Sequence, residues 1–344
     1  MLPRAMSDLL VPEEAPRPRP RPRADLAADV PVPCWHALSA GAGVLADGPL
    51  PALGDAEGQT VPASLGPVCD AHVHVFPDQV MAAIRRWFER HGWPVRYELA
   101  ARPLLRFLRT RGVERVVALH YAHKPGVARS FNRFMADIVA EHDFVVGTAT
   151  VFPGEPDAAA ILYEAFDAGL RGVKMHCHVQ CMSPDDLERM DAVYRACVDR
   201  DQALVMHAGR EPSSPAYSCD ARAICGADRV AAVLAQHPRL RLCVPHLGMD
   251  ELDAYAELLE RFDNLWLDTT MVLSDYFDID ERQLTRLLTM RPERILYGSD
   301  FPNIPYAWDR ELKRLGRHGL DDEGLERLLW RNAHDFYDFS ALQS

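Results

Sequence analysis

The sequence predicts an α/β fold of the (β/α)8 TIM-barrel class, and three observations lead to this expectation. From Pro67 onward, apolar strand-like runs alternate with amphipathic helical stretches. The runs number eight and are spaced by roughly 23 to 45 residues, which suits a barrel of about 250 residues. No glycine-rich dinucleotide loop follows the first run, which disfavours an open doubly wound sheet as the alternative.

Each strand is predicted from a short apolar run that is bounded by polar or turn-forming residues. The eight predicted strands cover residues 68–75, 114–119, 144–151, 171–176, 203–207, 241–246, 264–268 and 294–299. Helical periodicity is clear between several of them, for example at 185–200 and 228–236. Together these elements predict one barrel domain over residues 67–344.

Two segments precede the predicted barrel. Residues 16–23 read PRPRPRPR, a composition that cannot bury apolar surface, so we expect a disordered arm over residues 1–30. Residues 31–66 are rich in glycine, alanine and proline, with a turn signal at Asp47-Gly48. We expect a small irregular β-element there, tied to the barrel.

The overall composition limits the class of partner. The chain has 344 residues, of which 48% are hydrophobic and 26% charged, as in ordinary globular proteins. A net charge of −12 disfavours nucleic acid and anionic membranes as partners, because both would repel it. We therefore expect a small-molecule substrate and no membrane or nucleic-acid partner, and a homodimer is an open alternative for the assembly.

The N-terminal segment and the cysteines both indicate the cytoplasm as the compartment. Residues Met1 to Ala24 lack the apolar core of a signal peptide, and no apolar stretch approaches the length of a membrane span. The eight cysteines are scattered without a C-x-x-C pair, which fits a reducing compartment. Cys69, Cys197 and Cys243 fall in strand or helix patterns and are predicted to be buried thiols.

Metal-binding residue types gather at the predicted strand ends. In a barrel of this class the chemistry lies at the C-terminal ends of the strands. Alternation along a strand should place Asp70, His72 and His74 on one face. Strand one ends in His72 and His74, strand four in His176 and strand five in His207. Strand six ends in His246 and strand eight in Asp300. This concentration of histidine predicts a metal site.

Five motifs, in this order, resemble the amidohydrolase superfamily: DAHVH, MHAG, VPHLG, LYGSDFP and RNAHDFYDF. The similar branch holds small metal-dependent TIM-barrel hydrolases and enzymes like aminocarboxymuconate-semialdehyde decarboxylase, and the resemblance covers Val68 to Phe339. It implies one divalent metal ion held by four ligands, with His246 beside it as a base or polarising group. The implied ligands are His72, His74, His207 and Asp300.

The implied chemistry agrees with these residue types. Neutral imidazoles and a carboxylate suit Zn²⁺ with one position left open for water, whose pKa such a metal lowers towards neutrality. Asp300 could also accept a proton, and His246 could polarise a carbonyl or carry a proton. Each residue also has a plainer structural interpretation, such as a helix N-cap for Asp300.

We therefore expect a metal-dependent hydrolase that acts on an amide, ester or lactone carbonyl of a small molecule. The alternative is a metal-dependent non-oxidative decarboxylase, and the ligand set does not separate the two.

Four further residues are candidates for substrate contacts. Lys174, His176 and His178 alternate along strand four, and in two-metal members of the superfamily a carboxylated lysine at this strand end bridges the metals. A structural or substrate-binding role is our preferred interpretation of Lys174. Arg210, three residues after His207, could clamp a substrate carboxylate. Solvent-facing loop residues, or an ion pair of Arg210 with Glu211, are the alternatives.

The loop after strand two adds polar residues at the same rim. It offers His120, Tyr121, His123 and Lys124, and ordinary polar loop residues are the equally good interpretation.

Overall fold

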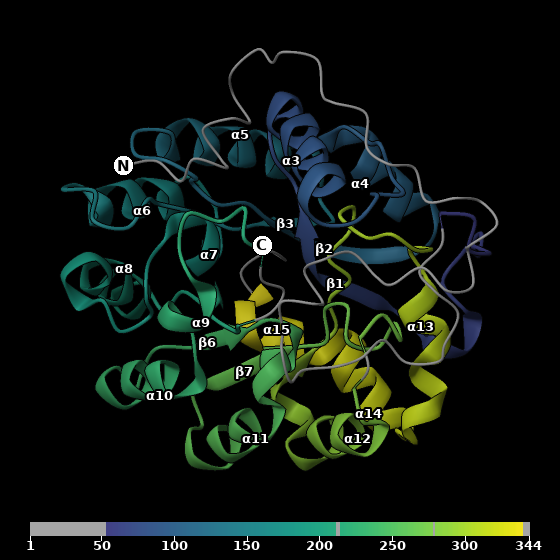
Figure 1. Cartoon of the computed structure of the whole chain (residues 1–344). Helices are drawn as coiled ribbons and strands as arrows, with labels where there is room; N and C mark the ends of the chain where they lie inside the picture. The colour runs from purple at the N-terminus through teal and green to yellow at the C-terminus, as the bar shows by residue number, and fades with distance from the viewer. Residues whose placement is uncertain (1–52, 211–213, 278, 340–344) are drawn as a thin grey trace.

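The computed structural model describes residues 53–210, 214–277 and 279–339. Eight parallel strands form the inner layer and helices surround them (Figure 1), which confirms the predicted barrel. The strands are β1 Val68–His74, β2 Val113–Leu119, β3 Val145–Gly147, β4 Val173–His176, β5 Leu204–His207, β6 Leu242–Val244, β7 Leu265–Asp268 and β8 Ile295–Leu296. Each begins within two residues of a predicted start.

Hydrogen bonds between the two halves of the sheet close the barrel. The ladders run β1-β2-β3 and β4-β5-β6-β7-β8. Lys174 N donates to Ala149 O at 2.9 Å, and His74 N donates to Phe301 O at 2.8 Å. The strands β3 and β8 are shorter than predicted because the chain continues past them as single bridges, at Ala149 and Phe301, rather than as regular ladders.

The helices cover the outside of the barrel. They are α3 Asp78–His91, α4 Ala101–Thr110, α5 Ala128–Glu141, α6 Ala158–Asp167, α7 Cys177–Gln180, α8 Leu187–Asp199, α9 Ala221–Ile224, α10 Ala227–Gln236, α11 Leu252–Arg261, α12 Glu281–Met290, α13 Arg310–Arg314, α14 Asp322–Glu326 and α15 Asn332–Tyr337. The helical pattern of 185–200 explains α8, whose buried residues Met190, Val193, Tyr194 and Cys197 recur at helical spacing.

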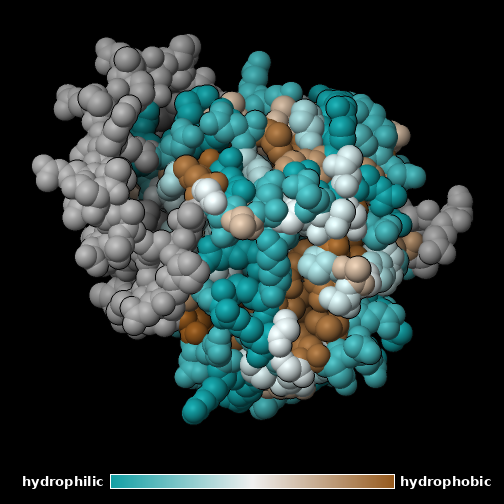
Figure 2. All heavy atoms as spheres, turned by 90° about the vertical axis from the view of Figure 1, so that its right-hand side faces the viewer, coloured by the Kyte–Doolittle hydropathy of each residue, from teal (hydrophilic) through white to brown (hydrophobic). Residues whose placement is uncertain are grey.

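The helices leave a polar outer surface. Figure 2 shows hydrophilic residues over most of one side of the molecule, with hydrophobic residues in smaller areas between them. Among the described residues, no helix is long and apolar enough to cross a membrane.

An apolar cluster fills the barrel interior. Every strand except β4 contributes to it, and the C-terminal helix α15 closes it with Phe336 and Tyr337. At β4 the matching interior position is taken by Lys174, which pairs in register with Val205 of β5. A fully buried lysine therefore replaces an apolar side chain in the middle of the barrel.

The segment before β1 is only partly described. Residues 53–66 contain turns and a 3-10 helix, η3 (Ala63–Leu65), and no strand. Glu57 ties this segment to the barrel: its carboxylate lies 3.2 Å from Arg96 Nη2 and 3.1 Å from Arg111 Nη2. The predicted arm and the turn at Asp47-Gly48 lie outside the described residues.

Candidate metal centre

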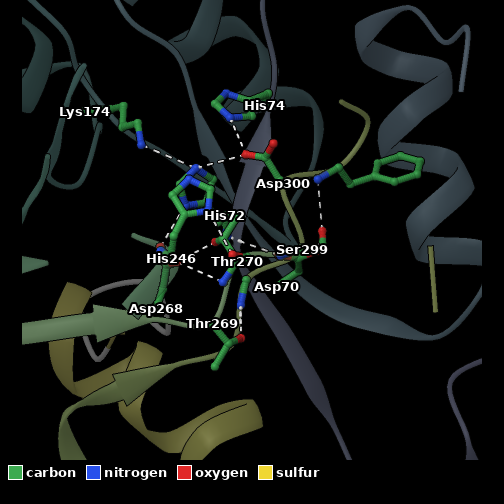
Figure 3. A network of polar contacts seen from close by, with 12 residues as sticks. Asp70, His72, His74, Lys174, His246, Asp268, Thr269, Thr270, Ser299 and Asp300 are labelled. Carbon is green, nitrogen blue, oxygen red and sulfur yellow. Dashed lines mark hydrogen bonds and ion pairs between the residues drawn. The ribbon is translucent and has the colours of Figure 1, made fainter. Parts of the chain in front are cut away.

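Three side chains bring metal-ligand atoms together at the C-terminal end of the barrel. His72 and His74 end β1, Asp300 follows β8, and one donor atom from each lies within 4.8 Å of the others. Asp300 Oδ1 lies 2.9 Å from His74 Nε2 and 3.6 Å from His72 Nε2 (Figure 3). Two imidazoles and a carboxylate are donors that Zn²⁺ and similar divalent ions accept.

A buried carboxylate orients the first of these histidines. Asp268, the last residue of β7, places Oδ2 at 2.8 Å from His72 Nδ1. The ionised carboxylate only accepts, so Nδ1 carries the proton and Nε2 keeps a lone pair, which a cation or the Lys174 amine can approach. A carboxylate behind the imidazole is typical of metal-binding histidines, because it holds the tautomer and the ring orientation.

His246 is oriented by a backbone carbonyl oxygen, as His72 is by a carboxylate. Its Nδ1 lies 2.9 Å from the carbonyl oxygen of Thr270, which accepts a hydrogen bond from Nδ1–H. Nε2 is then unprotonated, and the ring lines the same pocket as His74 and Asp300. This imidazole is set up to receive a proton at Nε2.

His207, the remaining ligand implied by the resemblance, lies in a stack of histidines. Its ring is 4.2 Å from that of His176, nearly parallel at 7°, and 4.8 Å from that of His246. It lines the pocket, but it is not part of the group of three whose donor atoms converge. Its role as a metal ligand therefore stays a prediction.

The protonation states fit a cation. Burial, and then the positive charge of Lys174, lower the pKa of His72 to about 4. Burial likewise lowers the pKa of His246. Burial opposes ionisation of Asp300, but His74 and His72 outweigh it and the pKa of Asp300 is lowered. Neutral imidazoles beside an ionised carboxylate are the form in which these groups bind a metal.

Among the described residues, two histidines that line the pocket each have an unpaired ring nitrogen. His74 Nδ1 and His176 Nδ1 are buried without a hydrogen-bond partner in the described part of the chain. Buried polar atoms are normally paired, and unpaired ones mark a functional site or an absent water or ion.

Lys174 reaches the same site from inside the barrel. Its Nζ lies 3.4 Å from His72 Nε2, and burial lowers the pKa of this amine to about 8. Lys174 contacts a ligand rather than the pocket, because it is absent from the pocket walls. Lys174 therefore lies next to the ligand His72. A carbamate on Lys174 that bridges two metal ions stays a prediction.

Two residues of the site have a strained backbone conformation. His246 and Asp300 have positive φ angles of 61° and 66°, a left-handed conformation that costs non-glycine residues free energy and is found at functional sites. Gly298 has no room for a side chain, because a Cβ would lie 2.6 Å from His72 Cβ. The chain just after β8 therefore passes directly against His72 of β1.

Asp70 supports this junction rather than the pocket. It accepts hydrogen bonds from the backbone N–H groups of His72 at 3.2 Å and Ser299 at 3.1 Å, and from the Ser299 hydroxyl. The register with β2 shifts between Asp70 and Val73, so simple alternation does not run through this stretch. Asp70 is thus a positioning residue for the strand ends.

An aromatic pocket leads to the three donor residues. The space between its walls is about 550 Å³ when open solvent is included, and only about 40 Å³ of it can hold the centre of a water molecule. The apolar walls are Ile84, Trp87, Phe88, Trp93, Tyr121, Val179 and Tyr217, and the polar ones are His74, His176, His207, His246, Asp300 and Asn303. Aromatic walls together with polar groups suit a small organic substrate that has a flat apolar part.

The remaining candidates lie at different distances from this pocket. His178 is behind the wall, with Nε2 2.9 Å from Gly209 O and its ring 5.3 Å from that of Tyr217. Arg210 is not among the wall residues: its Nη2 lies 3.4 Å from Glu251 Oε1 and its Nε donates to Cys225 O. The structure therefore does not bring Arg210 to where it could clamp a substrate carboxylate.

Of the loop after strand two, Tyr121 alone reaches the pocket. His120 is buried and its Nε2 lies 3.2 Å from Asn132 Oδ1, and His123 is buried as well. Lys124 is partly exposed and is not a wall residue. Most of this polar loop is thus structural.

Sequence reasoning missed Asp268 and the aromatic walls. Asp268 ends strand seven, so the rule that chemistry lies at strand ends could have found it. Trp87 and Trp93 come from α3 and the segment after it, and their helical pattern resembles that of an ordinary core. Nothing in the local sequence distinguishes these tryptophans from packing residues.

Solved structures with the same fold include enzymes of two reaction types. An uncharacterised TIM-barrel protein from Bordetella bronchiseptica is 16% identical with a TM-score of 0.62, and the match covers 81% of this chain and 100% of the Bordetella chain. A 5-carboxyvanillate decarboxylase from Novosphingobium aromaticivorans, complexed with manganese, is 16% identical with a TM-score of 0.58 and coverages of 82% and 100%. A putative 2-pyrone-4,6-dicarboxylic acid hydrolase from Pseudomonas putida is 18% identical with a TM-score of 0.55 and coverages of 79% and 98%.

The family assignment comes from the sequence match rather than from these distant structures. No curated protein matches the chain. The amidohydrolase family model matches residues 69–339, which span the barrel from β1 to the end of the described C-terminus and include every residue of the candidate centre. The chain belongs to the amidohydrolase family.

Proposed function

We propose that the protein is a metal-dependent hydrolase of a small molecule with an amide, ester or lactone carbonyl. One observation carries the proposal: donor atoms of His72, His74 and Asp300 lie within 4.8 Å of one another, and His74 and Asp300 line a pocket that His246 also lines. When bound, a divalent ion there supplies a Lewis acid that polarises an oxygen and lowers the pKa of water. Zn²⁺ suits the nitrogen-rich donor set, and Mn²⁺ is the alternative.

His246 would act as the base. Its Nε2 has a lone pair because Nδ1 donates to Thr270 O, and its lowered pKa keeps the ring neutral near pH 7. It would take the proton from the attacking water and return it to the leaving group. Asp300 would be one of the groups that hold the ion, and its ionised carboxylate could accept a hydrogen bond from the attacking water.

The aromatic walls would bind and orient the substrate. Trp87, Trp93, Tyr121 and Tyr217 line the pocket, and rings of this kind favour a flat apolar or aromatic group. They would also exclude bulk water, so that the carbonyl approaches the polar side in one orientation.

A non-oxidative decarboxylase is the second candidate. The 5-carboxyvanillate decarboxylase with the same fold and the aromatic walls favour it. Decarboxylation, however, needs an acid that delivers a proton to the carbon from which carbon dioxide leaves. The lowered pKa of His246 makes the neutral base its dominant form, which fits its role as the base in the hydrolysis proposed above.

The test is a substrate panel with two readouts. The purified chain is analysed for bound metal and then offered lactones, aryl esters, amides and carboxylated phenols. Chromatography detects hydrolysis products, and carbon dioxide release is measured in parallel. Hydrolysis lost in His246→Asn supports the proposal. Carbon dioxide release without hydrolysis would establish the second candidate. If the protein contains no metal and a chelator does not reduce its turnover, both candidates are rejected.

A further inference from the structure

Four cysteines surround His178, just behind the pocket wall. Cys177 and Cys181 lie one helical turn apart, at the start and the C-terminal cap of α7. Cys219 and Cys225 flank α9. The side chains meet as two pairs, Cys181 with Cys219 and Cys177 with Cys225. Among the described residues these thiols do not form a group of three converging ligand atoms, so the arrangement is one of pairs rather than a metal cluster.

The sulfur atoms of Cys181 and Cys219 lie near the same backbone carbonyl oxygen. Cys181 Sγ lies 3.6 Å and Cys219 Sγ 3.3 Å from the carbonyl oxygen of His178. Ser218 Oγ lies 3.0 Å from Cys181 Sγ. Both cysteines are partly exposed, whereas Cys69, Cys177, Cys197, Cys225 and Cys243 are buried. Among the seven described cysteines, this pair is therefore the one that a solute can reach.

The surroundings favour a thiolate at one member of the pair. The adjacent Cys219 thiol, then the Ser218 hydroxyl and the charge of Arg189, outweigh partial burial and lower the pKa of Cys181 to about 6. The same contact raises the pKa of Cys219. A thiolate is the nucleophilic form of cysteine, and a neighbouring thiol can resolve the product of its oxidation.

We propose that Cys181 and Cys219 form a peroxide-sensitive thiol pair that closes into a disulfide beside the pocket. The Cys181 sulfur attacks one oxygen of hydrogen peroxide, the O–O bond breaks, and Cys181 becomes a sulfenic acid while the other oxygen leaves as water. The Cys219 sulfur then attacks the Cys181 sulfur, the S–S bond forms, the S–O bond breaks, and the second water leaves. Two thiols are oxidised and one peroxide is reduced.

The disulfide would connect two parts of the substrate pocket. Cys219 follows two residues after Tyr217, a wall residue. On the other side, the carbonyl that both thiols contact belongs to His178, whose ring is 4.8 Å from that of His207 and 5.3 Å from that of Tyr217. Oxidation would therefore restrict the wall at Tyr217. The inference holds for either candidate reaction, because it concerns the thiols alone.

The experiment uses the full chain with its metal. One equivalent of hydrogen peroxide is added at pH 7, remaining thiols are alkylated, and tryptic peptides are analysed by mass spectrometry. Arg222 separates Cys219 from Cys225, and fragmentation distinguishes Cys177 from Cys181. We expect a linked 181–219 peptide, loss of two alkylatable thiols per chain, and full recovery with dithiothreitol. Before oxidation, Cys181 should alkylate at least about tenfold faster than Cys69 or Cys243.

Two variants sharpen the result. In Cys219→Ser the linked peptide should vanish and dimedone should trap a sulfenic acid at Cys181. The matched control Cys197→Ser removes a buried thiol on α8 and should leave the linkage unchanged. Linkage of a different pair, or two thiols that stay alkylatable while methionines oxidise, would overturn the proposal. So would thiol-bound zinc that is released by Cys181→Ser, because the four cysteines would then be a metal site.

Discussion

The two ends of the barrel interior are built from opposite kinds of side chain. At the C-terminal ends of the strands lie His72, His74, His246, Asp268 and Asp300, with two of the residues in left-handed backbone conformations. At the other end, helix α15 closes the interior with an aromatic cluster, in which the Phe336 and Trp266 rings are 5.3 Å apart.

The difference shows how one small barrel separates stability from chemistry. Burying apolar rings stabilises the fold, whereas burying imidazoles, a lysine and carboxylates costs free energy unless they are paired. The polar end is compatible with folding because each strand also contributes to the apolar cluster, except β4, which carries Lys174. Changes at the polar end should therefore affect metal and turnover, and changes at the apolar end should affect stability.

The largest effect is expected from removing the paired ligands. His72→Ala/His74→Ala should abolish stoichiometric metal binding and lower kcat/KM by about 10³-fold or more, since a Lewis acid contributes several kcal/mol. Metal analysis and turnover measure both effects. His237→Ala, at the C-cap of α10, is the control and should change neither. A double variant that keeps its metal and activity would refute the site.

His246→Asn should keep the metal and the fold but lose activity by roughly 10²- to 10⁴-fold, the usual contribution of a general base. Burial lowers the pKa of His246, so wild-type activity is present above that lowered pKa and is lost as pH falls through it. The variant should lack this acidic limb in its pH–rate profile. If the purified variant contains no metal, His246 is a metal ligand. If it turns over normally, the role of His246 is structural.

Phe336→Ala tests the apolar end. Truncating this fully buried ring should lower the free energy of unfolding by about 3–5 kcal/mol, measured by urea denaturation. Metal content and kcat at a temperature where the variant is folded should stay at wild-type values. Phe134→Ala on α5, which is only partly buried, should cost less. Loss of metal in a folded Phe336→Ala protein would contradict the separation of the two ends.

Asp268→Asn should weaken metal binding by roughly 10- to 100-fold, because the carboxylate that orients His72 is lost. Metal titration against a competing chelator measures the affinity. Asp263→Asn, with a side chain that is 88% exposed, removes a carboxylate nearby in sequence without touching the site. Equal affinities for the two variants would show that Asp268 does not support the ligand.

Deleting Met1 to Val30 should have the smallest effect. The proline–arginine composition of this segment cannot pack an apolar core, so Tm and metal content should be unchanged. Calorimetry and metal analysis of the truncated chain test this. A clear drop in either would show that the segment docks on the barrel.

The sequence by itself determined the barrel and the main residues of its polar end. Parallel strands all point the same way, so residues that end different strands meet at one end of the barrel. The eight apolar runs therefore predicted not only the strands but also the meeting of His72 and His74 with Asp300, more than 200 positions away. The same periodicity predicted the buried thiols Cys69, Cys197 and Cys243, which the structure confirms.

Only the tertiary structure decided which atoms face one another. Asp268 behind His72, Lys174 inside the barrel, Arg210 turned towards Glu251, and Cys181 beside Cys219 all depend on side-chain rotamers and on loops between strands. Periodicity reports which face of an element is buried, but it carries no information about the distance between two side chains on different elements. That distance is set by the packing of the whole barrel. It decides whether a residue only supports the site or takes part in its chemistry.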